Sequence, residues 1–261
     1  MTTDPHPPLD PAFYVDDCMH LSFKDDTFDL VFGSPPYEDA RTYGIDFKHK
    51  GEAWVEWALP RFEECLRVCR GVVAWVVRGK QKNYASSATP ERLMVALQDR
   101  GYTLRRPLFY HRHGIPGSGG PDWFANKVET IVCATRHPGK LPWSNNSACG
   151  EPPKYGPGGA MSHRLPNGER KHNPERRKDG GKTKDQTYRP PAKSNPGNVI
   201  DCGAVGGGHI GSKLAHENEA PFPEKLAEFA IKSLCPPGGC VLDPFSGSGT
   251  TVCAAYKLGR H

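Results

Sequence analysis

The chain has 261 residues and a net charge of +5, which predicts a mildly basic protein of one large or two small domains. Hydrophobic residues make up only 36%, so part of the chain is not expected to build core. No run of 18 apolar residues and no basic-then-apolar leader occurs, so we expect neither a membrane span nor an export signal. The nine cysteines form no Cys-x-x-Cys pair, which favours a reducing, cytoplasmic environment.

The first half of the chain alternates apolar runs with amphipathic segments. Strands are predicted at 28–33 (FDLVFG) and at 72–77 (VVAWVV), the second being suited to burial on both faces. A helix is predicted between them at 52–70, and Pro60 is expected to kink or split it. A further helix at 90–101 has proline at its start and glycine at its end.

The later elements continue this alternation. The next strand (TLRRPLFYH) is interrupted by Pro107, and another strand is predicted at 130–135. Pro223 opens a helix, followed by a strand at 240–243 and a helix at 249–259. Strand–helix alternation of this kind predicts an α/β fold with a parallel sheet.

A basic segment separates these two groups of elements. Residues 136–193 contain 13 Lys and Arg against 5 Asp and Glu, a net charge of +8, and the remainder of the chain carries −3. The segment is rich in Gly, Pro and Asn and has almost no apolar periodicity. Because it can bury little surface, we expect it to be loop-like when it is alone.

The sequence SPPY at 34–37 directly follows the first predicted strand. Two prolines in series lack two N–H groups and can continue neither a sheet nor a helix. The motif therefore predicts a stiff hook with an aromatic tip. Taken alone, it is more typical of a structural turn with a buried tyrosine than of a functional site.

A glycine-rich turn, DPFSGSGTT at 243–251, follows the last predicted strand and opens a helix. Such a turn lets the backbone approach a ligand and points N–H groups at it. A phosphate-binding loop would need a lysine before Thr250, and a dinucleotide site would need glycine where Val252 stands. A plain strand-to-helix turn stays open as the alternative for this motif alone.

Together, the hook and the glycine turn resemble the amino-methylating DNA methyltransferases, which use S-adenosyl-L-methionine. A third segment, ENEAPFPEKLAEFAIKSL, and a weaker one, YVDDC at 14–18, match the same family. The resemblance covers about 13–137 and 198–261, in the order of the permuted subgroup, with the hook first. It implies a Rossmann-like methyltransferase sheet with an inserted, loop-rich target-recognition region.

The resemblance assigns the chemistry to the hook, Ser34, Pro35, Pro36 and Tyr37. An exocyclic amine is a poor nucleophile, and acceptors for its hydrogens push electron density onto the attacking nitrogen. Ser34 and the carbonyl of Pro35, held by two rings, can supply such acceptors, and Tyr37 can stack on the extruded base. Extrusion is implied because the amine is inaccessible inside the duplex.

The resemblance places the cofactor between the glycine turn and two further segments. Asp17 would lie near the adenosine, and the Pro-Phe-Pro segment would line the opposite wall. Thr250 would either touch the cofactor or only cap its helix. The expected cofactor residues are Asp17, Pro221, Phe222, Pro223, Asp243, Pro244, Phe245, Ser246, Gly247, Gly249 and Thr250.

The same resemblance gives the domain organisation and the partner. Residues 1–137 and 200–261 would form the catalytic domain, in which the family's C-terminal strand and helix are apparently missing, so weak cofactor binding is expected. Residues 138–199 would contact double-stranded DNA, although a flexible, solvated charge run is the alternative. About eight phosphate contacts would give a salt slope of roughly −7. A restriction endonuclease is a candidate second partner, and the oligomeric state is not readable.

The identity of the methylated atom stays open on the sequence alone. A serine hook resembles cytosine-N4 more than adenine-N6 enzymes, although either side chain could accept a hydrogen bond. Carbon methylation of cytosine would need a Pro-Cys nucleophile, and none of the cysteines follows a proline. A catalytically inert DNA-binding remnant and an RNA or protein methyltransferase also stay open. His111 and His113 lack further ligands at fixed spacing, so no metal is expected.

Overall fold

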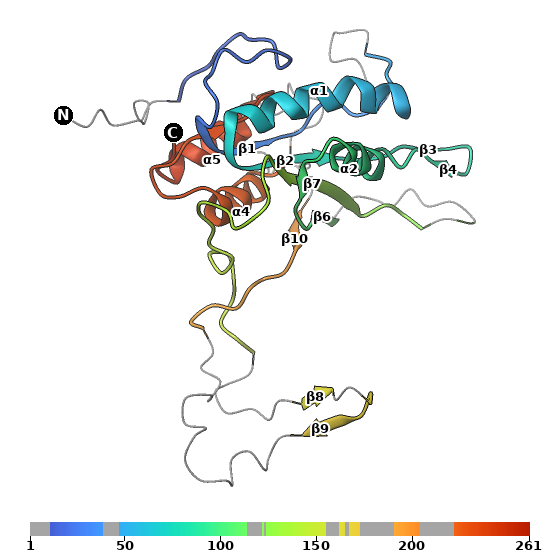
Figure 1. Ribbon diagram of the computed structural model, residues 1–261, viewed down its shortest axis with the longest axis vertical. Helices are drawn as coiled ribbons and strands as arrows, with labels where there is room; N and C mark the ends of the chain where they lie inside the picture. Colours follow the sequence, from blue (N-terminus) through green and yellow to red (C-terminus); the bar gives the residue numbers. More distant parts are fainter. Residues whose placement is uncertain are drawn as a thin grey trace, which may run out of the picture. The chain divides into compact units, whose positions relative to one another are not determined.

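The computed structural model describes residues 11–38, 47–113, 122, 124–154, 162–164, 167–172, 191–203 and 222–261. The chain divides into two compact units: residues 1–145 together with 197–261, and residues 146–196. The larger unit holds the main sheet and its helices (Figure 1). The predicted catalytic motifs all fall within it.

A seven-stranded sheet forms the centre of the larger unit. Its strands are β1 (Phe28–Gly33), β2 (Cys69–Val77), β5 (Thr103–Leu104), β6 (Leu108–His113), β7 (Val128–Thr135), β10 (Val199–Gly203) and β11 (Val241–Leu242). They lie in the order β10, β6, β7, β2, β1, β11, and β5 pairs with β7 beside this path. Together with its flanking helices, this arrangement is an α/β fold, as predicted.

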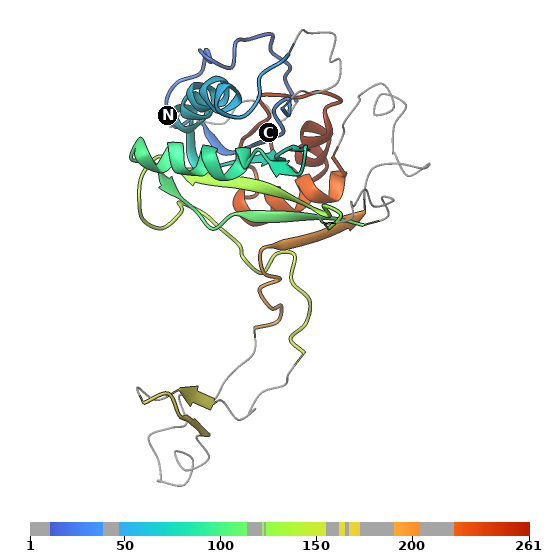
Figure 2. The same cartoon turned by 90° about the vertical axis from the view of Figure 1, so that its right-hand side faces the viewer.

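Helices cover both faces of the sheet (Figures 1 and 2). α1 (Glu52–Val68) and α2 (Thr89–Asp99) pack together over one face, and α4 (Glu224–Leu234) and α5 (Thr250–Lys257) pack together over the other. In the described part of the chain, no helix is both long enough and apolar enough to cross a membrane.

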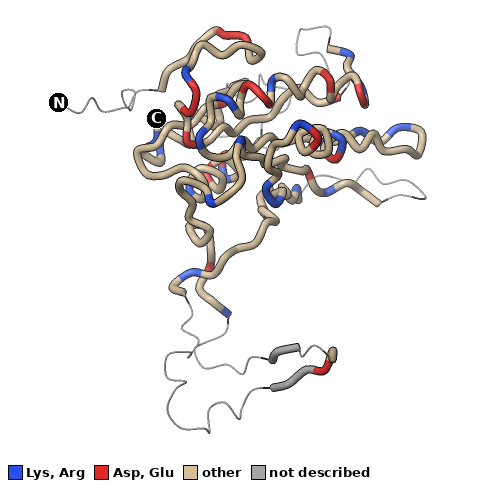
Figure 3. The backbone as a smooth tube through the Cα atoms, in the orientation of Figure 1, with Lys and Arg blue, Asp and Glu red and all other residues tan. Residues whose placement is uncertain are grey.

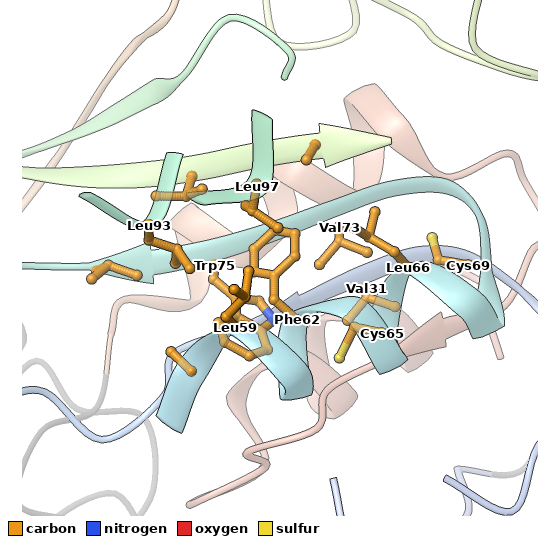
Figure 4. Close-up of a cluster of buried hydrophobic side chains, with 14 of the residues drawn as sticks. Val31, Leu59, Phe62, Cys65, Leu66, Cys69, Val73, Trp75, Leu93 and Leu97 are labelled. Atoms are coloured by element: carbon orange, nitrogen blue, oxygen red, sulfur yellow. The ribbon is translucent and has the colours of Figure 1, made fainter. Parts of the chain in front are cut away.

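Successive side chains of a strand point to opposite faces of the sheet and pack into two separate core clusters. On β1, Val31 packs into the cluster under α1 and α2, whereas Leu30 and Phe32 pack into the cluster under α4 and α5. The first cluster is centred on aromatic and aliphatic side chains such as Phe62 and Trp75, which are fully buried (Figure 4). Each such side chain contributes about 1.5–3 kcal/mol of transfer free energy. Burial on both faces explains the nearly continuous apolar strands.

The helix predicted around Pro60 is neither split nor interrupted. Proline removes only one N–H, and α1 buries Leu59 and Phe62 on either side of it. The packing of this apolar stripe therefore outweighs the lost hydrogen bond.

The sheet departs from the parallel arrangement expected from the alternation. β7 runs antiparallel to β2, β5 and β6, while β10–β6 and β2–β1–β11 are parallel. No crossover helix separates β6 from β7 within the described residues, so the chain returns in the opposite direction. The predicted break at Pro107 is confirmed, since β5 ends at Leu104 and β6 begins at Leu108.

The smaller unit contains a two-stranded antiparallel sheet, β8 (Ser162–Arg164) with β9 (Arg170–His172). Its two ends are joined to each other, because Ser194 N–H and its hydroxyl both donate to the carbonyl of Glu151. The basic run at 173–190 lies outside the described residues. The role of the unit in recognising DNA stays a prediction.

Candidate active site

The hook and the glycine turn meet at one edge of the sheet. β1 and β11 are parallel neighbours, with Val31 opposite Leu242. Because parallel strands end at the same edge, the hook after Gly33 and the turn from Asp243 leave the sheet side by side. A Cβ atom on Gly33 would lie 2.4 Å from Asp243 Oδ1 and 3.3 Å from Pro244 Cδ. The two motifs, which lie far apart in the sequence, therefore border one site.

The hydroxyl proton of Ser34, just beyond the end of β1, is already used in a hydrogen bond. Its hydroxyl donates to the carbonyl of Val76 on β2, with an Oγ–O distance of 3.2 Å. A serine hydroxyl has one proton and two lone pairs, so this bond leaves the oxygen able to accept. Trp54 Nε1 on α1 donates to the carbonyl of Pro36 at 2.8 Å, and Pro35 is buried. The hook is thus braced against two elements of the fold.

Glu38, directly after the hook, ties it to three other segments. Its buried carboxylate, 6% exposed, accepts from the N–H of Gly51, from the hydroxyl of Ser87 and from the N–H of Lys80. Burial alone would raise the pKa of Glu38, but hydrogen bonds from Ser87, Gly51, Thr89 and Lys80 outweigh it and hold the pKa below its usual value. The ionised carboxylate fixes where the hook ends.

Tyr37 is held by a carboxylate from a different part of the sheet. Its hydroxyl donates to Glu129 Oε2 on β7 at 2.8 Å. The other carboxylate oxygen, Oε1, accepts from Arg112 on β6. Burial and the nearby charge of Glu129 raise the pKa of Tyr37 well above its usual value, so the phenol stays protonated. The Tyr37 hydroxyl is therefore tied, through Glu129 and Arg112, to β7 and β6.

The glycine turn makes a half-buried cradle. Asp243 Oδ1 accepts from the N–H of Phe245 at 3.0 Å, and burial raises the pKa of Asp243 to about 6. Gly247 and Gly249 have φ angles of 49° and 75°, in the left-handed region that favours glycine. The N–H of Gly249 donates to the carbonyl of Ser246 at 2.7 Å, which closes the turn in front of α5.

This cradle fits a ligand that carries both a cation and hydrogen-bonding groups. The Ser246 hydroxyl is buried and has no partner among the described residues. Asp243 holds a carboxylate in a site that desolvates it, where a cation would stabilise the charged form. The N-terminus of α5 opens onto the same turn, and no side chain caps it. The suggestion that Thr250 caps this helix is therefore wrong; Gly249 occupies the N-cap position.

Aromatic rings line both sides of the cradle. The ring of Phe245 packs edge-on against Trp75, with centroids 5.0 Å apart, and tilts against Trp57 at 6.3 Å. Phe222 packs edge-on against Phe32 of β1 at 5.6 Å. β1, the strand that leads into the hook, therefore has Phe245 on one face of the sheet and Phe222 on the other.

The Pro-Phe-Pro segment is only partly within the described residues. Pro223 is the N-cap of α4, and Phe222 precedes it beside β1. Pro221 lies outside the described residues. The role of these three residues toward the cofactor stays a prediction.

Asp17 lies in a local turn. Its carboxylate accepts from the N–H of Met19 at 2.9 Å, and the residue is exposed. Phe13, four residues earlier, approaches the glycine turn: its Cζ lies 4.0 Å from where a Cβ atom on Gly249 would be. The segment thus passes the cradle, while the predicted contact of Asp17 with the adenosine stays a prediction.

Three residues around the hook were not predicted from the sequence: Glu38, Trp54 and Glu129. Glu129 offered a signal, because a lone carboxylate beside the apolar strand TIVCAT must find a partner once it is buried. Glu38 and Trp54 offered none, since their partners come from segments distant in sequence.

Solved structures share this architecture. The PvuII DNA methyltransferase (cytosine-N4-specific) aligns over 95% of this chain and 78% of its own, with a TM-score of 0.65 and 19% identity. TTHA0409, a DNA modification methylase of Thermus thermophilus solved in complex with S-adenosyl-L-methionine, aligns over 92% of this chain and 81% of its own, with a TM-score of 0.53 and 21% identity. These similarities establish the fold.

Sequence relatives point to one family. The orphan methyltransferase M.BamHII of Bacillus amyloliquefaciens is 28% identical over 240 residues, 90% of this chain and 82% of its own length. The type II methyltransferase M.BglII of Bacillus subtilis is 27% identical over 248 residues, 93% of this chain but 61% of its own length. The family profile described as DNA methylase, which groups N6 and N4 enzymes, matches residues 28–261. The chain therefore belongs to this DNA methylase family.

Proposed function

We propose that this DNA methylase transfers a methyl group from S-adenosyl-L-methionine to the exocyclic N4 of a cytosine extruded from double-stranded DNA. The observation that carries the proposal is the close approach of Gly33 to Asp243, where a Cβ would lie 2.4 Å from the carboxylate. This contact puts the acceptor hook beside the cradle suited to a cationic ligand.

The hook would activate the amine by accepting its hydrogens. Because Ser34 donates its own proton to Val76, its oxygen keeps lone pairs with which it would accept a hydrogen of the amine. The Pro35 carbonyl, held between two prolines, would take the second hydrogen. As the N–C bond forms and the S–C bond breaks, positive charge develops on the nitrogen, and these acceptors stabilise it. The nitrogen then releases one proton to water.

Tyr37 would hold the base flat against these acceptors. Its hydroxyl is fixed by Glu129, which leaves the ring as the stacking surface. Base–aromatic stacking contributes about 1–3 kcal/mol per base, comparable with the few kcal/mol that extrusion costs.

The glycine turn would hold the cofactor, which supplies an electrophilic methyl group on a sulfonium. The Ser246 hydroxyl would donate to it, and the N-terminus of α5 would face its carboxylate. Asp243 would pair with positive charge, which relieves the desolvation that raises its pKa to about 6. Phe222, Pro223 and Phe245 would bound this space.

Cytosine is favoured over adenine by the serine in the hook. Family members with serine at the first position of the hook resemble cytosine-N4 enzymes, and those with aspartate at that position resemble adenine-N6 enzymes. Adenine-N6 transfer is the second candidate, because the acceptors at Ser34 and Pro35 suit either amine.

One experiment separates these functions. The purified chain is incubated with unmethylated genomic DNA and S-adenosyl-L-methionine, and the DNA is digested to nucleosides for mass identification. N4-methylcytosine is expected, and N6-methyladenine would move the assignment to the alternative. Ser34→Ala should lose most of the product, while Ser22→Ala, an exposed serine that bonds to Asp16, should not. DNA binding without any methylated nucleoside would identify an inert binding protein instead.

The basic segment at 138–199 would contribute phosphate contacts. With up to about eight contacts, log affinity for a duplex should fall with log salt with a slope of roughly −7. An affinity that barely changes between low and high salt would remove this role.

A further inference from the structure

A small β-hairpin projects from the edge at which β2 ends. β3 (Gln81–Lys82) pairs antiparallel with β4 (Ala85–Ser86) through the two-residue turn Asn83–Tyr84 (Figure 1). All residues of the hairpin are exposed, and Tyr84 is 69% exposed at its tip. The chain enters the hairpin just beyond Val77, beside the hook. The hairpin therefore extends from the active-site edge of the sheet.

The turn carries a bulky residue where glycine is favoured. Asn83 and Tyr84 have φ angles of 50° and 63°, so both are left-handed, as a type I′ turn requires. Asparagine tolerates this conformation and glycine usually follows it, whereas a β-carbon strains the backbone. Backbone strain of this kind clusters at functional sites, so a strained tyrosine at an exposed tip points to a functional position.

The base of the hairpin is bonded to the hook. Lys80 N–H donates to Glu38 Oε2 at 3.1 Å, and Ser87 N–H donates to the carbonyl of Lys80 at 3.0 Å. The hydroxyl of Ser87 also donates to Glu38. Because Glu38 follows Tyr37 directly, the base of the hairpin is fixed to the end of the hook.

The hairpin is also basic. Residues 78–88 include Arg78, Lys80 and Lys82 and contain no carboxylate. Figure 3 shows Lys and Arg positions, in blue, along this projection. The phosphates of a DNA duplex that lies across the edge of the sheet carrying the hook would be attracted to this positive charge.

We propose that this hairpin is a wedge that enters the DNA stack: Tyr84 fills the space left by the extruded base, while Lys80 and Lys82 contact the flanking phosphates. The proposal rests on the proposed function, since it presupposes that a base is extruded toward Tyr37. An aromatic side chain in the gap replaces the stacking that the neighbouring bases lose. The wedge thus favours the extruded state.

The methylated site is mapped first, and the test then compares two DNA duplexes that carry this site. One has a fully paired target, and in the other the base opposite the target is mismatched, so that extrusion is already easier. Tyr84→Ala should lower kcat/KM on the paired duplex by about 10-fold to 100-fold, the loss of one stacking contact. On the mismatched duplex the loss should shrink to within about 3-fold.

Two further variants separate the ring from the backbone. Tyr84→Gly removes the ring and relaxes the turn, so it should melt no lower than wild type and still lose activity on the paired duplex. Tyr256→Ala, an equivalent change at a tyrosine on α5 that is 59% exposed, should leave both rates unchanged. Tyr84→Phe should retain most activity, because stacking needs the ring and not the hydroxyl.

The outcomes distinguish this inference from the proposed function. Equal rates of Tyr84→Ala and wild type on the paired duplex would overturn the wedge, as would an equal loss on both duplexes. Failure of the wild type to methylate even the mismatched duplex would count against the proposed methyl transfer instead.

Discussion

A single added methyl group at Gly33 should disrupt the junction on which the site depends. Gly33 has an ordinary φ angle, so Gly33→Ala introduces no backbone strain there. The new Cβ would lie 2.4 Å from Asp243 Oδ1 and 3.3 Å from both Asp243 Cγ and Pro244 Cδ. Real Cβ atoms essentially never approach a heavy atom that closely, so either the hook strand or the glycine turn must shift.

The size of the effect follows from what must move. Asp243 cannot swing away freely, because Oδ1 also accepts from the N–H of Phe245, and the ring of Phe245 packs against Trp75. Overpacking of this kind costs about 1–3 kcal/mol, which lowers the melting temperature by roughly 2–12 °C in a chain of this size. The displaced carboxylate should weaken cofactor binding by at least about 10-fold.

The assay pairs thermal melting with calorimetric titration of S-adenosyl-L-methionine. Gly101→Ala is the matched control: its φ is +86° and no atom lies within 4 Å of the new Cβ, so it strains the backbone by about 1–2 kcal/mol away from the site. The control should lose stability but bind the cofactor normally. Normal binding by folded Gly33→Ala would refute the close junction of hook and turn.

Three further changes test other parts of the site. Burial raises the pKa of Asp243 from 3.8 to about 6, so its contribution to stability is full below about pH 4 and is lost as the pH rises through 6. Asp243→Asn should therefore have a higher free energy of unfolding than wild type at pH 8, by up to about 3 kcal/mol, but not at pH 4. If the stabilities of the two proteins change in parallel with pH, this reasoning is contradicted. Glu129→Gln should lower kcat about 10-fold with little change in KM, and it should have little further effect on kcat in a Tyr37→Phe background, because Glu129 is expected to act on kcat through its bond to the Tyr37 hydroxyl; additive effects on kcat would assign the role of Glu129 to its pair with Arg112 instead. Arg70→Met leaves the buried Asp29 carboxylate without its bidentate partner. The free energy of unfolding in urea should fall by about 2–3 kcal/mol, less than for a fully buried pair because Arg70 is one-third exposed. An unchanged urea midpoint would show that the pair is dispensable.

The fold was largely readable because its signals are local. The apolar runs at 28–33 and 72–77 and the proline and glycine at the ends of α2 predict their elements from neighbouring residues alone. The direction of β7 was not readable, since an apolar strand has the same composition whether it runs parallel or antiparallel. The two short strands β3 and β4 were also missed, because Asn-Tyr is a weak turn signal beside Asn-Gly.

The candidate site could be predicted only where the chemistry lies in a motif. SPPY and the glycine turn are contiguous, and their meeting follows from two strands that end at one edge. The supports of the hook are different: Glu129 is 92 residues from Tyr37, and Ser87 is 49 residues from Glu38. Such partners are set by the packing of strands and helices, which a single sequence does not specify.

The antiparallel course of β7 brings the ends of several strands to one edge of the sheet. β6 ends at His113 and β7 begins at Val128 at the edge that carries Tyr37, as the bond from Tyr37 to Glu129 requires. β10 also ends at this edge, at Gly203, before the chain continues to α4. The described ends of β6 and β10 and the start of β7 therefore lie at the edge of the sheet that carries the hook. The junction of hook and glycine turn rests instead on the separate pairing of β1 with β11, so substitutions at the ends of β6, β7 and β10 need not alter it.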